Sequence, residues 1–236
     1  MPADVRIHAY RVGAGTAATE RWRAPGWTVA ALAALIACQG PNHVPDDVIA
    51  NMSRPDPPLA RLTQLLGEAR TQSDSYLSGE ALPARKDIAA IVDADPRPWW
   101  QSLTPDQTFL LFEASPETAA RAPADVRVNA YCAGVETVSA EWWGTPGAPQ
   151  TQLSQRVIAL GAPAARCLAR LFDDERRIFY KDGESQFESR QNQWTVADLA
   201  AGLAARALGE SYDASAAPAE RAARRDALRA SMASAL

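Results

Sequence analysis

The spacing of apolar side chains along the chain predicts a series of short amphipathic helices. In PPLARLTQLLGEAR (57–70), leucine and alanine recur three and four residues apart, which places them on one helix face. Similar patterns predict helices from Ala84 to Val92, from Pro105 through FLLFEA to Ser115, and from Pro123 to Trp143. Thr104 before Pro105 is a strong start signal, since a hydroxyl can cap a helix and proline suits its first turn. The fold class is therefore mainly α.

The second half of the chain adds further helices. Leu153, Val157, Ile158 and Leu160 form an apolar stripe that Gly161 ends, and Pro163 begins the next helix. So short a turn predicts an antiparallel helix pair. VADLAAGLAARALG (196–209) predicts a strong helix with Gly209 as its C-cap, and residues 218–234 an exposed helix rich in alanine and arginine.

A polar segment separates these helices near residues 177–194. The β-prone Ile178, Phe179 and Tyr180 precede Asp182-Gly183, and Asp-Gly between such runs is a hairpin signal. We expect either a small β-hairpin or an ordered insertion loop here. Its aromatic residues, Phe179, Tyr180, Phe187 and Trp194, are expected to pack the insertion onto the helices.

The most apolar stretch is WTVAALAALIAC (27–38), which follows Arg21 and Arg23. It is about a dozen residues long, whereas a membrane span needs about 20, so it matches the apolar region of a secretory signal peptide. LIAC (35–38) resembles the lipobox of bacterial lipoproteins. In that family the cysteine at the position of Cys38 is acylated and becomes the N-terminus after cleavage.

This resemblance implies a signal peptide (1–37), a flexible tether (38–56), a helical domain (57–209) and a C-terminal helical extension (210–236). It also implies a lipid anchor in the bacterial cell envelope. Gln39 is not the aspartate that retains enteric lipoproteins in the inner membrane, which favours the outer membrane facing the periplasm. The alternative is that residues 27–38 form a buried helix of a cytoplasmic domain.

The segment VIALGAPAARCLARLFDDER (157–176) resembles one unit of HEAT-like α-helical repeats, in which an LG-x-P turn joins two helices. RVNAY, EWW and the closing VADLAA helix extend the likeness to uncharacterised bacterial HEAT-like proteins. HEAT arrays bury their faces by stacking several units. Because one unit is clear, the expected architecture is either an irregular helical bundle or a short HEAT-like α-solenoid.

Charge and composition exclude several function classes. The 236 residues carry 24 basic and 28 acidic side chains, and the basic ones are scattered, which argues against nucleic-acid binding. The two histidines, His8 and His43, fall in the predicted leader and tether. A helical domain without histidine excludes Ser-His-Asp and Cys-His nucleophiles and the usual zinc sites. We therefore expect no cofactor, no metal and no catalytic set.

One catalytic alternative stays open. A carboxylate-dependent hydrolase acting on an envelope glycan needs an acid and a base in one cleft. Asp173, Asp174, Glu184 and Glu188 are the carboxylates that could supply them.

The remaining candidates are cysteines and tryptophans. Cys132 and Cys167 could form a disulfide in an oxidising envelope compartment, or could be two buried apolar residues. The pairs Trp99-Trp100 and Trp142-Trp143 are candidate partner-binding residues, since exposed tryptophans anchor proteins and sugars. The alternative places one tryptophan of each pair in the core. The sequence thus favours a non-catalytic interaction scaffold, anchored by lipid, with an envelope protein or a wall component as partner.

Overall fold

The computed structural model describes residues 56–78 and 83–234, which contain eleven α-helices and no β-strand. This confirms the mainly α fold class. The elements are α3 (Pro57–Thr71), α4 (Ser73–Leu77), α5 (Pro83–Ala94), the 3-10 turn η1 (Trp99–Gln101), α6 (Pro105–Ala114), α7 (Pro116–Arg121), α8 (Ala124–Thr137), η2 (Ala140–Trp142), α9 (Gln152–Ala159), α10 (Ala162–Leu168), η3 (Ala169–Leu171), α11 (Gly183–Asn192), α12 (Val196–Ala207) and α13 (Pro218–Ser234).

Side-chain caps begin several of these helices where the sequence predicts a start. Asp56 accepts a hydrogen bond from the Leu59 amide at 3.3 Å, and prolines occupy the first turn of α3. Thr104 and Gln107 form a capping box at α6, and a second capping box begins α12. Such caps satisfy amides that have no partner inside the helix. The predicted helices beginning at Pro57 and Pro105 are confirmed.

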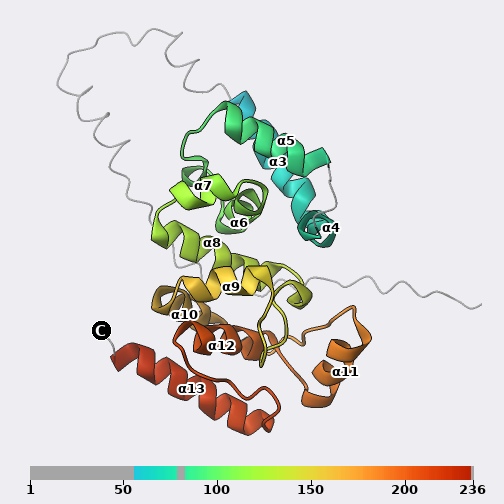
Figure 1. Cartoon of the computed structure of the whole chain (residues 1–236), viewed down its shortest axis with the longest axis vertical. Helices are drawn as coiled ribbons and strands as arrows, with labels where there is room; N and C mark the ends of the chain where they lie inside the picture. Colours follow the sequence, from blue (N-terminus) through green and yellow to red (C-terminus); the bar gives the residue numbers. More distant parts are fainter. Residues whose placement is uncertain (1–55, 79–82, 235–236) are drawn as a thin grey trace, which may run out of the picture. The chain divides into compact units, whose positions relative to one another are not determined.

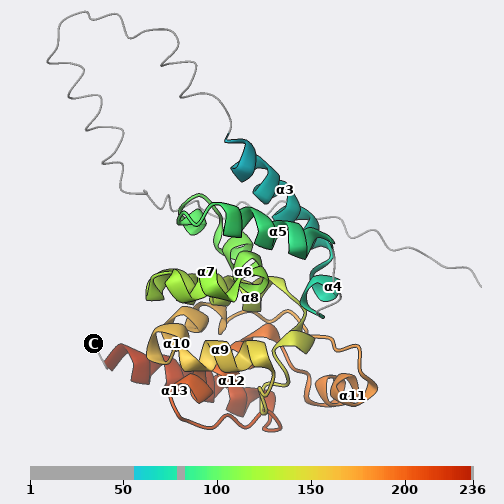
Figure 2. The same ribbon diagram turned by 45° about the horizontal axis from the view of Figure 1, so that its top comes forward.

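The described helices pack largely in chain order, from α3 to α13 (Figures 1 and 2). Helix α3 contacts α5 and α6, α6 packs on α8, α8 on α10, and α12 receives α9, α10 and α13. Contacts between near neighbours along the chain give a bundle with a solenoid-like progression. Its core is a continuous set of large apolar side chains, among them Leu62, Leu66, Ile88, Phe109, Phe112, Trp143, Leu168 and Leu203.

The structure differs from the sequence prediction at several helix ends. Two short helices, α4 and α7, occupy segments in which no helix was expected. Helix α8 ends at Thr137 rather than Trp143, because Val138 is extended and a separate turn, η2, follows. The predicted pair α9 and α10 is present, with Gly161 at φ 63° between the helices, but both pack mainly on other helices, including α12.

The predicted β-hairpin or loop at 177–194 is wrong, because most of this segment is the helix α11. Asp182 accepts a hydrogen bond from the Ser185 amide at 2.7 Å and so caps the helix, and Gly183 is its first residue. A single bridge between Arg177 and Thr195 is the only extended pairing within the segment as described. Aspartate before glycine suits a hairpin turn and a helix start equally, and here the helix forms.

Helix α13 has the predicted bounds but is not exposed on every face. Leu228 and Met232 are buried, and the helix packs on α10 and α12. In the part of the chain that the structure describes, no helix is long and apolar enough to cross a membrane. The predicted signal peptide (1–37), Cys38 and the tether up to residue 55 lie outside the described residues.

Candidate functional site

Two phenylalanines of the insertion are strongly exposed. Phe179 precedes α11 and is 65% exposed, and Phe187 lies on α11 and is 67% exposed. They are the large hydrophobic side chains of the described residues that water reaches most. The prediction that they pack the insertion onto the helices is therefore wrong, although Tyr180 and Trp194 are buried as expected. Strongly exposed aromatic side chains on a folded domain are candidates for an interaction site.

We call the exposed side chains Arg177, Phe179, Phe187 and Arg190, which lie on α11 or just before it, the insertion surface. Arg177, Phe179 and Arg190 line one cavity of about 270 Å³ together with Ser189 and Gln193. Arg177 and Phe179 also line a second cavity of about 300 Å³ against α8 and α12. The exposed aromatic residues are thus accompanied by hollows that side chains of a partner could enter.

Buried hydrogen bonds hold the insertion, residues 177–194, against the rest of the domain. The Tyr180 hydroxyl donates to the Gly144 carbonyl at 3.1 Å, and the Trp194 indole donates to the Ala214 carbonyl at 2.7 Å. The Ser189 hydroxyl donates to the Ile178 carbonyl at 2.8 Å. Burial raises the pKa of Tyr180 above its ordinary value. Because these side chains hold both ends of the segment, the two phenylalanines are presented on an ordered support.

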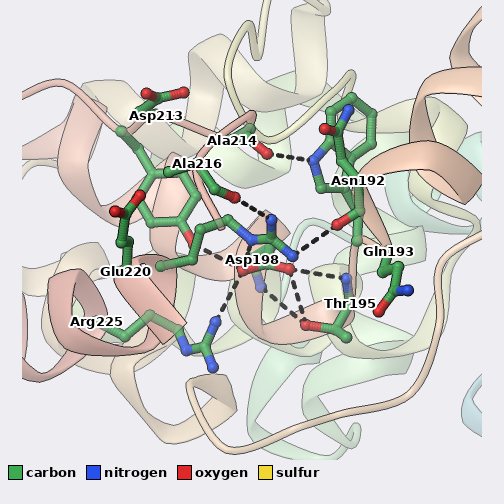
Figure 3. A network of polar contacts seen from close by, with 12 residues as sticks. Asn192, Gln193, Thr195, Asp198, Asp213, Ala214, Ala216, Glu220 and Arg225 are labelled. Atoms are coloured by element: carbon green, nitrogen blue, oxygen red, sulfur yellow. Dashed lines mark hydrogen bonds and ion pairs between the residues drawn. The ribbon is translucent and has the colours of Figure 1, made fainter. Parts of the chain in front are cut away.

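A charged network centred on Asp198 secures the end of the insertion (Figure 3). Asp198 is 1% exposed, and its Oδ1 accepts hydrogen bonds from Arg221 at 3.0 Å and Arg225 at 2.8 Å. The same oxygen accepts from the Tyr212 hydroxyl at 2.7 Å, and Oδ2 accepts from the Thr195 amide at 3.1 Å. Burial, followed by the hydrogen bond to Asp198, raises the pKa of Tyr212.

This network joins three helices. Arg221 on α13 also donates to the Asn192 carbonyl, at the end of α11, at 2.7 Å, while Asp198 lies in the first turn of α12. Both carboxylate oxygens of Asp198 are occupied by hydrogen bonds within the protein. A carboxylate saturated in this way orders its surroundings rather than reacting with a substrate.

Several arginines line the hollows beside the insertion surface. Arg177 lines a third cavity, of about 400 Å³, beside the Asp198 network, so it borders all three hollows. Carboxylates lie among these arginines, since Asp174 pairs with Arg176, and Glu184 and Glu188 are exposed on α11. The region therefore offers an acidic partner individual arginines rather than a basic face.

The arginines of this face differ in how far they are neutralised. Arg176 pairs with Asp174 at 2.6 Å and lowers the pKa of that carboxyl. Arg177 instead donates to the neutral Gln193 amide oxygen at 3.1 Å. Arg190 is exposed and makes no ion pair within the described part of the chain. A partner's carboxylate could pair with Arg177 or Arg190 without first breaking an ion pair within the described residues.

The four candidate tryptophans are not equally accessible. Trp99 is 2% exposed and Trp143 is fully buried, whereas Trp100 and Trp142 are partly buried. The Trp142 indole donates to Asp74 at 3.0 Å. Each pair therefore places one tryptophan in the core, and a partner would reach only Trp100 and Trp142.

The four candidate carboxylates are not brought together in a cleft. Asp173 pairs with Arg229 at 2.9 Å, and Asp174 pairs with Arg176. Glu184 and Glu188 are exposed on α11, and neither lines any of the three cavities beside the insertion surface. The paired acid and base that a glycan hydrolase needs are therefore not found among these residues.

Cys132 on α8 and Cys167 on α10 face one another as a disulfide pair. Their Cα atoms are 6.3 Å apart, which is within the range of native disulfides. The pair would join two helices that already pack together.

Comparison with protein-family models, with curated proteins and with solved structures finds no match for this chain. The resemblances to a lipobox and to HEAT-like repeats stay predictions from the sequence.

Proposed function

We propose that this protein is a lipid-anchored scaffold of the bacterial cell envelope whose helical domain binds another envelope protein. The insertion surface is the binding face. The observation that carries this proposal is the strong exposure of Phe179 and Phe187 on a segment held rigidly by Tyr180, Trp194 and the Asp198 network. Exposed aromatic anchors on an ordered support lose little conformational entropy on binding.

The chemistry of this face favours an apolar segment of the partner that also carries acidic residues. Phe179 and Phe187 offer apolar contact area, and the cavities beside Phe179 can receive side chains. Arg177 and Arg190 offer guanidinium groups without a carboxylate partner in the described residues. Aspartate or glutamate of the partner would pair with them.

Peptide display against the purified full-length chain tests this chemistry. We expect the selected peptides to combine aromatic or aliphatic residues with aspartate or glutamate. Binding, measured by fluorescence polarisation, should weaken at least about tenfold in Phe187→Ser and in Arg177→Glu, because an anchor and a charge pair each contribute on the order of 1.4 kcal/mol or more. Arg61→Glu on α3 is the matched control, since Arg61 is exposed and lines none of these cavities. Equal affinity for all variants would rule out the insertion surface.

The anchor is tested separately. LIAC predicts acylation at Cys38, so metabolic labelling with a palmitate analogue should mark the wild-type chain and not Cys38→Ser. More than one acyl chain gives stable membrane attachment, so the label should remain in the membrane fraction. An unlabelled, soluble wild-type chain would instead favour a cytoplasmic helical adaptor.

A further inference from the structure

A fourth cavity, of about 460 Å³, shares no lining residue with the three beside the insertion surface. It is bordered by α5 and α6 on one side and by η2 and α9 on the other, and its polar side chains include Arg85, Glu113, Glu141, Trp142 and Arg156. Its volume is that of a small-molecule site. We call it the Glu113 cleft.

Glu113 supplies a buried carboxylate with one oxygen uncommitted. Its side chain is 8% exposed, and its Oε1 accepts hydrogen bonds from the Tyr131 hydroxyl at 3.2 Å and from Arg156 at 2.5 Å. Its Oε2 has no hydrogen-bond donor within the described residues, yet it is not sealed from the solvent in the cavity. Burial, together with the nearby Glu113, raises the pKa of Tyr131 to about 12, so this phenol stays a donor. The free oxygen is an acceptor site for a ligand.

Arg85 supplies a cation beside this carboxylate. Its guanidinium donates to the Tyr76 carbonyl at 3.2 Å and to the main-chain carbonyl of Glu113 at 2.6 Å, and it pairs with no carboxylate of the described residues. A guanidinium has five donors, so three stay available to a ligand. Because Arg85 binds the main-chain carbonyl of Glu113 itself, the guanidinium and Glu113 are neighbours in the lining of the cleft.

The rest of the cleft is held in place. The Trp142 indole donates to Asp74 at 3.0 Å, and the Thr151 hydroxyl donates to the Trp142 carbonyl at 2.6 Å. Hydrogen bonds from Lys181 and then from Trp142 lower the pKa of Asp74, which keeps it an acceptor. Trp142 therefore forms a fixed apolar wall beside the two charged groups.

We propose that the Glu113 cleft binds a small zwitterion, a free amino acid, with its carboxylate on Arg85 and its ammonium on the free oxygen of Glu113. Two arginines and two glutamates make the lining neutral overall, which matches a neutral ligand that carries both charges. Arg156 pairs with Oε1 of Glu113, so Oε2 is left for an ammonium and Arg85 for a carboxylate. In an amino acid both groups are attached to the same carbon, so one small ligand could contact both side chains. A neutral sugar would leave Arg85 without an anion. This proposal does not depend on the proposed function, because the two sites share no residue.

Isothermal titration calorimetry of the full-length chain tests the proposal. The probes are the free L- and D-amino acids, and for any that bind, the N-acetyl form without the ammonium and the amide form without the carboxylate. We expect saturable binding of at least one amino acid, weakened about tenfold or more in each derivative, as the loss of one charged hydrogen bond predicts. Arg85→Gln and Glu113→Gln should weaken binding similarly, whereas the exposed Arg61→Gln should not.

Three results would overturn the proposal: no amino acid binds, the derivatives bind as tightly as the parent, or a neutral monosaccharide binds in their place. The derivatives are tested on the wild-type chain, so the result does not depend on the folding of Glu113→Gln. If no amino acid binds but peptides still bind at the insertion surface, the failure concerns the proposal for the Glu113 cleft and not the proposed function.

Discussion

At the scale of the residue, Asp198 shows how one buried carboxylate can support two arginines. Arg221 and Arg225 are nearly buried, and both donate to the same oxygen. Removing the shared partner of buried charges is far more costly than removing a partner at the surface, because the cations keep their desolvation penalty.

Asp198→Asn should therefore lower the free energy of unfolding by about 3 kcal/mol or more, measured by urea denaturation. Asp226→Asn on α13 is the control, since Asp226 is 75% exposed where it pairs with Arg229. Its loss should cost about 0.5 kcal/mol or less. A similar decrease in the free energy of unfolding in both variants would mean that the Asp198 network does not stabilise the fold more than a surface ion pair does.

The exposure of Phe179 and Phe187 is the residue-scale feature that the sequence indicated less clearly. Aromatic residues usually pack inward, which led to the expectation that all four aromatic residues of the insertion do so. The available signal was the surroundings of Phe187, where Glu184, Glu188, Arg190 and Gln191 make a polar helix with no apolar stripe. A single phenylalanine on such a helix has no core to face, so its exposure could have been predicted.

At the scale of the element, helix interiors could be predicted and helix ends in part. Apolar spacing located α3, α5, α6, α9, α10 and α12. Helices α3, α5 and α9 bury one face, whereas α6 and α12 are buried along consecutive residues. Asp182-Gly183 led to the wrong prediction of a hairpin or loop, because a helix cap and a hairpin turn use the same residues. After Thr137 the chain leaves the helix, and Ala140 and Trp143 are buried; no local sequence pattern indicates this break.

Close packing of α12 gives a second prediction. Gly202 lies against the loop before α9, where an added Cβ would overlap the main-chain oxygen of Pro146. Gly202→Ala should lower the free energy of unfolding by about 2 kcal/mol, although alanine favours helix. Gly67→Ala on α3 meets no atom within 4 Å and should raise it by about 0.5 to 1 kcal/mol. Thermal unfolding of both variants would show opposite shifts, and a stabilised Gly202→Ala would contradict this contact.

Cys132 and Cys167 give a third prediction, concerning α8 and α10. If both cysteines are oxidised in the envelope, the bond closes a loop with a sequence separation of 35 residues. The loop-entropy estimate is a stabilisation of about 3 to 4 kcal/mol. Thiol titration of the unfolded Cys38→Ser chain should find no free thiol before reduction and two after it, and reduction should lower the midpoint of unfolding. Two free thiols in protein isolated from the envelope would contradict the pairing.

At the scale of the whole molecule, the described helices combine a buried core with two separate polar sites. The insertion surface presents aromatic residues and arginines outward, and the Glu113 cleft holds its charges inside a hollow. The absence of histidine from this domain could be read from the sequence, whereas the separation of the candidate carboxylates required the structure. The Glu113 cleft could not be located from the sequence, because it joins residues that are distant along the chain. The insertion surface lies within residues 177–190 and was missed because its phenylalanines were expected to pack inward.

The central claim, that the insertion surface binds an envelope protein, is tested most directly by site-specific photo-crosslinking in living cells. A photoreactive amino acid at position 187 should give one discrete, identifiable crosslinked protein, and that product should be lost in Arg177→Glu. The same probe at the exposed Gln64 of α3 should not give this product. The absence of a crosslink at position 187, or the same product from position 64, would contradict the account.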